Sequence, residues 1–225
     1  MKEKMPELIN LGMNPLSCSF KEIMDAAQKK VSIHLDDEVI RSLKENAYKL
    51  CFAKKVGDED YNVIWQSFLG YENYNNFSWL PSYQIFTANE LRENVEVEVR
   101  SKMVPIGLGE TVVRDKYGVL SDAVSGGEST ALNLINNGEP TCVGISQLCT
   151  DIDGRQISAP IYVSERKIIA GEAGFKPMEK LLVWFEQNVE TGMMFSHVRS
   201  RAIEFDMASR NSMSVTFNGN DWMTI

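Results

Sequence analysis

The sequence has few of the groups that most enzymes use for catalysis. Its 225 residues include only two histidines, His34 and His197, and neither lies in a recognisable motif. Ser-His-Asp and Cys-His catalysis each need an imidazole beside the nucleophile. Metal-binding C-x2-C and H-x3-H spacings, a G-x-S-x-G elbow and a glycine-rich phosphate loop are also missing from the sequence. We therefore expect no metal, no cofactor and a non-enzymatic function.

Basic charge and long hydrophobic runs are scarce as well. Lys and Arg number 23 against 31 Asp and Glu, which gives a net charge of −8. This balance argues against a nucleic-acid partner, because such partners are held by basic side chains. No window approaches the roughly 18 consecutive apolar residues of a membrane helix, and the amino terminus does not resemble a signal peptide. We expect no transmembrane segment, and a location in the cytoplasm or export without a signal peptide.

Aromatic residues, by contrast, are concentrated in one stretch. Residues 65–86 hold eight of the twenty-one aromatic side chains. A similar skeleton follows later in the chain, since Trp184 and Phe205 are 21 residues apart, as are Trp65 and Phe86, and a Phe-Ser pair lies near the middle of each stretch. The shared order of these matches predicts an internal duplication of one β-rich unit, with each tryptophan in the core of its copy.

Alternation of apolar and polar residues marks several strands. It predicts strands over 48–56, 61–68, 82–87 and 94–102. In the last of these, Val95, Val97 and Val99 point one way and charged side chains the other, as in a half-buried antiparallel strand. Residues 36–47 fit either a strand or one face of a helix, and the sequence leaves both interpretations open.

Strands of this length separated by turns are typical of β-sandwiches. The predicted fold is mainly β, with two similar antiparallel, Ig-like β-sandwich units in tandem and a short N-terminal helix. Ser19 and Glu22 fit a capping box for that helix. The predicted boundaries are 1–30 for an arm with the short helix, 31–120 for the first unit, 121–130 for a linker and 131–225 for the second unit.

The segment GYENYNNFSWL at 70–80 is the most suggestive feature outside the expected core, and it is predicted to be a loop. Tyrosine, tryptophan and asparagine together are typical of recognition surfaces, because flat rings cover apolar faces while amides reach hydroxyls or backbone. The predicted ligand-binding residues are Tyr71, Tyr74, Asn76 and Trp79. The resulting hypothesis is a non-enzymatic binding or assembly protein that recognises a protein or a glycan and that pairs with itself as a homo-oligomer.

Two alternatives come from other classes of protein. The Ser/Thr/Gly-rich segment 121–130 lies beside alternating strands, and its rearrangement into a hairpin would make a toxin-like, pore-forming β-protein. An enzyme with Cys51 or Cys149 as nucleophile is the other alternative, although both cysteines follow a leucine in a strand pattern and are better interpreted as buried thiols. With Cys18 and Cys142 the chain has four cysteines, too few for a disulfide framework.

Overall fold

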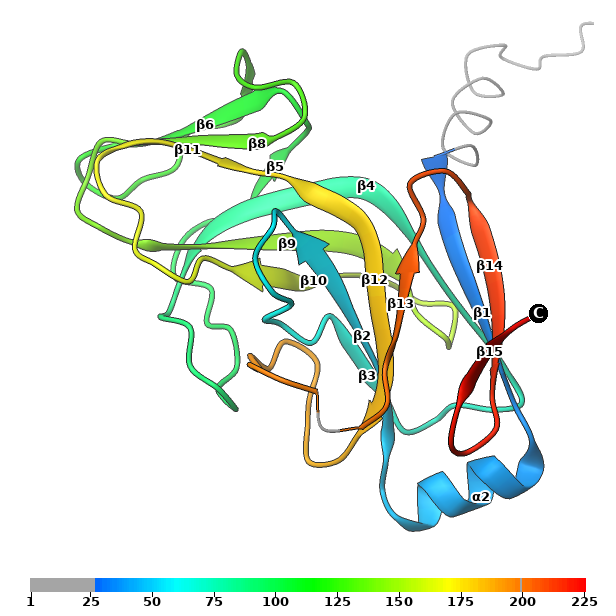
Figure 1. The fold of residues 1–225 in the computed structure, drawn as a ribbon. Helices are drawn as coiled ribbons and strands as arrows, with labels where there is room; N and C mark the ends of the chain where they lie inside the picture. The colour runs from blue at the N-terminus through cyan, green and yellow to red at the C-terminus, as the bar shows by residue number, and fades with distance from the viewer. Residues whose placement is uncertain (1–26, 199) are drawn as a thin grey trace, which may run out of the picture.

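Figure 1 shows the computed structural model of the protein, which describes residues 27–198 and 200–225. The prediction of a mainly β fold is confirmed, since the described chain is built from strands and a single α-helix, α2 (Asp37–Glu45). The helix expected around Ser19 falls outside the described residues. No described helix is long and apolar enough to cross a membrane.

The largest sheet contains seven strands and holds the centre of the fold. Its order is β10-β9-β4-β1-β14-β15, and β5 pairs with β4. The strands are β1 (Lys29–Leu35), β4 (Tyr74–Ala88), β5 (Val104–Ile106), β9 (Cys142–Thr150), β10 (Gln156–Val163), β14 (Ser212–Phe217) and β15 (Trp222–Thr224). Strand β4 pairs with β1 through its first residues and with β9 along most of its length, with a register shift between Trp79 and Tyr83. Such an irregularity lets a strand bend, and Figure 1 shows β4 strongly curved.

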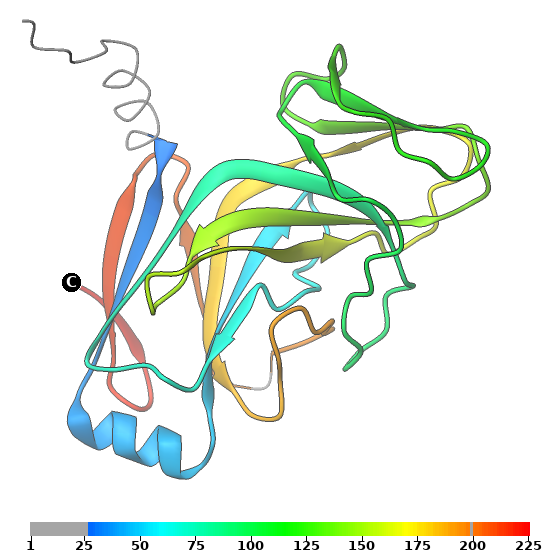
Figure 2. The same cartoon turned by 180° about the vertical axis from the view of Figure 1, so that it is seen from behind.

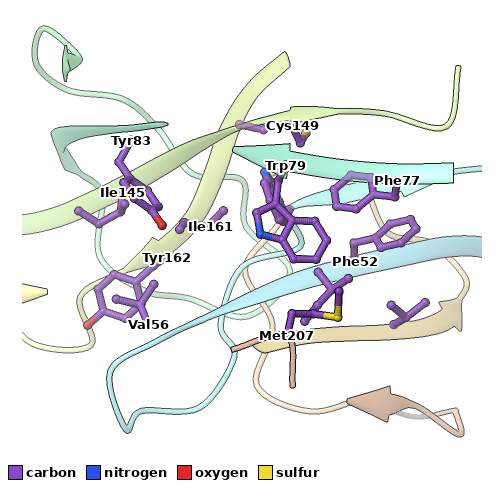
Figure 3. Close-up of a cluster of buried hydrophobic side chains, with 14 of the residues drawn as sticks. Phe52, Val56, Phe77, Trp79, Tyr83, Ile145, Cys149, Ile161, Tyr162 and Met207 are labelled. Atoms are coloured by element: carbon purple, nitrogen blue, oxygen red, sulfur yellow. The ribbon is translucent and has the colours of Figure 1, made fainter. Parts of the chain in front are cut away.

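A second sheet faces the first across the main core. Its order is β13-β12-β2-β3. The strands are β2 (Lys49–Val56), β3 (Gln66–Phe68), β12 (Pro177–Glu186) and β13 (Ile203–Asp206). Phe52 of β2 stacks on Phe77 of β4, with ring centroids 4.2 Å apart, and Trp79 lies next to them (Figure 3). Burial of these large aromatic rings between the two sheets stabilises the packing of one sheet on the other.

A third, smaller sheet has the order β11-β8-β6-β7 and extends away from the end of the molecule that carries α2 (Figures 1 and 2). The strands are β6 (Glu110–Arg114), β7 (Val124–Ser125), β8 (Leu132–Asn136) and β11 (Gly171–Phe175). The short strand β7 lies inside segment 121–130, which the sequence predicts to be a linker, and it pairs with β6.

Two tandem sandwich units are not confirmed. Strands from the ranges 31–120 and 131–225 pair with one another in shared sheets, as β1 does with β14, β4 with β9 and β2 with β12. Figures 1 and 2 show β1 and β14 side by side although they come from opposite ends of the chain. Alternation of apolar and polar residues in the sequence predicts where strands form, but it does not specify which strands become neighbours in a sheet.

The inferred duplication also lacks support from the two tryptophans. Trp65 lies in the main core against Phe77 and Trp79, and its Nε1 donates to the carbonyl oxygen of Gln147 at 3.3 Å. Trp184 belongs to a separate cluster and packs on Phe195. The equal spacings in the sequence therefore do not correspond to equal surroundings.

Individual elements differ in how well they were predicted. The strand over 48–56 is confirmed as β2, and residues 36–47 contain the helix α2, whose apolar side chains pack against the main core. The strand predicted over 94–102 is wrong. That segment makes only isolated bridges, and Val95 and Val99 are 39% and 41% exposed. Of its three alternating valines, Val97 is half-buried and packs against a small apolar cluster, whereas the other two face solvent.

Candidate functional site

The structure divides the four predicted ligand-binding residues between the inside and the outside of the main sheet. The expected loop over 70–80 is largely strand, because β4 begins at Tyr74. Tyr71 and Trp79 are 0% and 1% exposed, whereas Tyr74 is 72% exposed and Asn76 is exposed as well. Successive side chains of a strand point to opposite faces, so these four residues do not form one surface.

The two buried members have structural partners. The hydroxyl of Tyr71 donates to the backbone oxygen of Tyr48 at 2.9 Å, and burial raises the pKa of Tyr71 to about 12. The indole Nε1 of Trp79 donates to Glu179 at 3.0 Å, and the ammonium group of Lys54 lies 4.8 Å from the centre of the Trp79 ring. Both rings therefore stabilise the core, and neither is placed to contact a ligand on the surface.

The exposed members belong to a polar outer face formed by three adjacent strands, which we call the β1 face. Its inward neighbours, such as Val31 and Ile33, are fully buried. Three rows of paired residues make up this face: Tyr74, His34 and Thr216; Asn76, Ser32 and Ser214; and Ser78, Lys30 and Ser212. The residues are almost all Ser, Thr, Asn, Tyr or His, a composition that resembles the recognition surfaces of binding proteins.

Tyr74 lies at one end of the β1 face and packs against a neighbouring ring. The ring of His34 meets it edge-on, with centroids 4.6 Å apart. Beside the two rings is a hollow of about 550 Å³, and its lining includes three carboxylates, from Asp36, Asp37 and Glu72. The arrangement places a large exposed aromatic surface next to concentrated negative charge. Such a pair of features suits a cationic side chain.

Within the β1 face, Asn76 is oriented by a neighbour. The hydroxyl of Ser32 donates to Asn76 Oδ1 at 2.8 Å, which orients this exposed amide, and its NH2 group can act only as a donor. At the hollow, Asn73 Nδ2 donates to Asp37 Oδ1 at 2.8 Å and to the backbone oxygen of Leu35 at 3.0 Å. These bonds fix the polar groups at the edge of the hollow before any partner arrives.

A second concavity, which we call the Trp184 cup, was not predicted from the sequence. Its volume is about 360 Å³. Its apolar floor and walls come from Trp184, Ile64, Val189, Met193 and Phe195, and its polar groups come from Glu93, Asn94, Glu186, Gln187, Asn188 and His197. Eight of the eleven lining residues lie between Trp184 and His197, and the other three come from two distant segments, at Ile64 and at Glu93 and Asn94. The sequence shows that stretch but not the two segments that close the cup around it.

The thiols of the described cysteines are poorly suited to nucleophilic attack. Cys51, Cys142 and Cys149 are all buried. Burial raises the pKa of each thiol, in the case of Cys149 to about 12. A thiol that keeps its proton at neutral pH reacts slowly, because the thiolate is the nucleophile. The described cysteines therefore give no support to a cysteine-dependent enzyme.

The acidic pair Asp151 and Asp153 forms a turn. One carboxylate oxygen of Asp151 accepts the backbone N–H groups of Asp153 at 2.9 Å and of Arg155 at 2.8 Å. The carboxylate is thus committed to its own turn. Within residues 27–198 and 200–225, no group of three or more metal-ligating side chains is gathered at one point.

Comparisons with known proteins find no family model, no curated protein and no solved structure that matches this chain. The arguments for function therefore come from the geometry of the β1 face.

Proposed function

We propose that the protein is a non-enzymatic binding protein that recognises a protein partner through the β1 face. The proposal rests mainly on Tyr74, whose ring is 72% exposed and contacts the ring of His34. Next to this ring is the hollow that is lined by three carboxylates. A tyrosine supplies a large contact area and loses little side-chain entropy when it is buried by a partner. The surrounding serines, threonine and asparagine offer hydrogen bonds to a peptide backbone.

The charge around the hollow defines the partner further. Asp36, Asp37 and Glu72 favour a lysine or arginine of the partner, whose stem would pack on the Tyr74 ring while its charged end reaches the carboxylates. The net charge of −8 would also speed the approach of a basic partner at low salt. We therefore infer a partner segment with at least one exposed basic side chain, and a glycan is the competing ligand.

Selection from a displayed library of random peptides, with a glycan panel in parallel, tests the proposal. We expect the selected peptides to be enriched in Lys and Arg, and we expect Tyr74→Ala to weaken their binding by at least about tenfold. Glu72→Gln should weaken it less, because one carboxylate of three is neutralised. Tyr117→Ala is the matched control, since Tyr117 is 79% exposed but lies in the turn after β6.

Two results would contradict the proposed partner. The first is that the Tyr74→Ala variant binds the selected peptides as well as the parent and the Tyr117→Ala variant do. The second is binding of glycans, and not of peptides, that is lost with Tyr74→Ala; the β1 face would then recognise sugars.

A membrane-active function is the second candidate, because of one observation on the third sheet. Tyr117, Val119 and Val124 are at least 60% exposed, and all three lie in or next to segment 121–130. Release of a dye trapped in phosphatidylcholine vesicles would support this candidate, provided that Val119→Ser with Val124→Ser reduces the release. Intact vesicles at all protein concentrations would argue against it.

A further inference from the structure

The β1 face continues onto a fourth strand, β15, which is an edge strand of the main sheet. Thr216 of β14 pairs with Met223 of β15, and the two residues of such a pair point to the same side of the sheet. The next pair, Phe217 and Trp222, packs into the main core, with ring centroids 4.7 Å apart. Met223 therefore lies on the outer side next to Thr216, where it is 47% exposed.

A second apolar side chain lies beside Met223. Ile225 is 75% exposed, and its backbone N–H donates to the oxygen of Ser214 at 3.1 Å, which continues the pairing of β15 with β14. Residues two apart in an extended segment point to the same side. Met223 and Ile225 thus form an exposed apolar strip along one edge of the β1 face, which we call the Met223 border. Single exposed apolar residues are common on protein surfaces, but neighbouring ones with polar groups around them are typical of contact surfaces.

Four residues make a row that crosses the face from the hollow to the Met223 border: Tyr74 of β4, His34 of β1, Thr216 of β14 and Met223 of β15. Neighbouring strands are about 4.8 Å apart, so the three steps between strands give the row a length of about 14 Å. The hollow is lined by Tyr74, His34 and Thr216, so it follows this row as far as the strand next to β15.

The two ends of the row suit different side chains. At the Tyr74 end the hollow is lined by the carboxylates of Asp36, Asp37 and Glu72, which favour a basic group. At the other end the Met223 border favours an apolar group, because contact between them removes apolar surface from water. A ligand that uses both ends carries a positive charge and an apolar group about 14 Å apart.

An extended peptide meets this requirement. Its length increases by about 3.3–3.6 Å per residue, so a distance of about 14 Å corresponds to about four residues. Its side chains alternate between two sides, and residues four positions apart point to the same side. A basic residue and an apolar residue at this separation can therefore contact the two ends of the row at once.

We propose that the β1 face binds an extended peptide that lies across its strands, with a Lys or Arg in the hollow and an apolar side chain on the Met223 border four residues away. The inference rests on the proposed function and adds a second point of contact, which defines the spacing in the partner. Methionine adapts to apolar groups of different shapes, so the apolar residue can be Leu, Ile, Met or Phe. Hydroxyl and amide groups of the face, such as those of Thr216 and Asn76, bond to the peptide backbone between the two contacts.

Fluorescence anisotropy with the whole protein and a series of labelled peptides tests the spacing. Each peptide carries one Lys and one Leu, separated by two, three, four, five or six positions in a chain of Ser and Thr, and each is made with Lys first and with Leu first. We expect a separation of four to bind about fivefold more tightly than three or five, because an odd separation places Leu on the opposite side of the peptide from Lys. Separations of two and six should also bind less tightly, because Leu then misses Met223.

Substitution of Met223 connects the spacing to the border. Met223→Ser, at an exposed position of an edge strand, should weaken binding of the peptide with separation four by about fivefold. It should leave unchanged the binding of a peptide in which Ser replaces Leu, and this double-mutant cycle isolates the contact between Met223 and Leu. Met178→Ser is the matched control, since Met178 is 37% exposed but lies in β12 of the second sheet.

The proposal is overturned if all separations bind equally, or if Met223→Ser binds the peptides as the parent does. If Tyr74→Ala still weakens binding in these cases, the proposed function stands and only the second contact is wrong. Absence of peptide binding, or binding that Tyr74→Ala does not change, contradicts the proposed function as well. A dimer that Met223→Ser dissociates and that binds no peptide would show instead that the border pairs with a second copy of the chain.

Discussion

At the scale of single residues, the most unusual group in the core is a charged lysine. Lys54 of β2 is 1% exposed, and its ammonium group bonds to Glu179 of β12 at 2.7 Å and lies over the Trp79 ring of β4. Since Trp79 Nε1 also bonds to Glu179, the three side chains join two facing sheets. Burial lowers the pKa of Lys54 to about 8. A buried ion pair of this kind adds little net stability, but removal of one partner is strongly destabilising because it leaves the other charge buried and unpaired.

The lowered pKa of Lys54 predicts a dependence of stability on pH. Between about pH 8 and 10.5 the unfolded chain binds a proton at Lys54 that the folded protein has lost, so this group makes the free energy of unfolding rise with pH. Below pH 8 both states are protonated and its contribution is constant. Compared with Lys54→Met, the parent should gain roughly 1–2 kcal/mol between pH 8 and 9.5.

Urea unfolding at several pH values measures this difference. Buried thiols and tyrosines have raised pKa values, and they lower the free energy of unfolding as the pH rises above about 9. Their effect is the same in the parent and in the variant, so it cancels when the two free energies of unfolding are subtracted. Lys55→Met is the control, because Lys55 is only half-buried and its ammonium group lies near the Tyr61 ring, outside the network of Lys54, Glu179 and Trp79. If the free energy of unfolding changes with pH by the same amount in the parent and in Lys54→Met, Lys54 does not titrate in this range.

At the scale of elements, the packing of β9 against β4 depends on one glycine. A Cβ added to Gly144 of β9 would overlap the ring of Phe86, a fully buried residue on the paired strand β4. Gly144→Ala should therefore lower the free energy of unfolding by about 1–3 kcal/mol.

The partner residue provides the check on that mechanism. Phe86→Leu in the Gly144→Ala background should recover part of the loss, and a double-mutant cycle measures the coupling. Gly70→Ala, where an added Cβ has no atom within 4 Å, should have little effect. If Gly144→Ala is as mild as Gly70→Ala, or if the two changes at 144 and 86 are additive, the contact does not limit the packing.

The same elements show what the sequence could predict and what it could not. Strand β2 and helix α2 carry their own periodicity, so local patterns were enough to find them. The first half of β4 has Asn75 and Asn76 where a loop is expected. It is a strand because the Asn75 side chain bonds to the oxygens of Ile33 and Glu72 and because β1, about forty residues earlier, pairs with it. Tertiary pairing overrides local propensity there.

The candidate sites follow the same rule. Tyr74 and Asn76 were predicted by composition and are exposed. Tyr71 and Trp79, chosen by the same criterion, are core residues, because the composition of a recognition surface and that of an aromatic core overlap. The Trp184 cup is formed mainly by residues 184–197, and only the fold brings the segments around 64 and 94 against them.

At the scale of the whole molecule, pairing between distant strands predicts that the chain folds as one unit. Fragment 1–120 contains β1, β2 and β4, and fragment 131–225 contains the strands that pair with them, β14, β12 and β9. Each fragment alone therefore lacks the pairing partners of its own strands. We expect each fragment alone to lack near-UV circular dichroism and a cooperative unfolding transition, and the whole chain to show one transition. A cooperative transition in either fragment would instead support the independent units that the sequence predicts.

Recognition by the β1 face also concerns the whole molecule, because strands from both ends of the chain form it. Amide NMR spectra of the labelled protein, titrated with a selected basic peptide, locate the contact surface. The proposed function predicts that signals of Ser32, His34, Tyr74 and Thr216 shift together and saturate with one affinity. Shifts confined to the turn at Tyr117, or spread without relation to the β1 face, would contradict it.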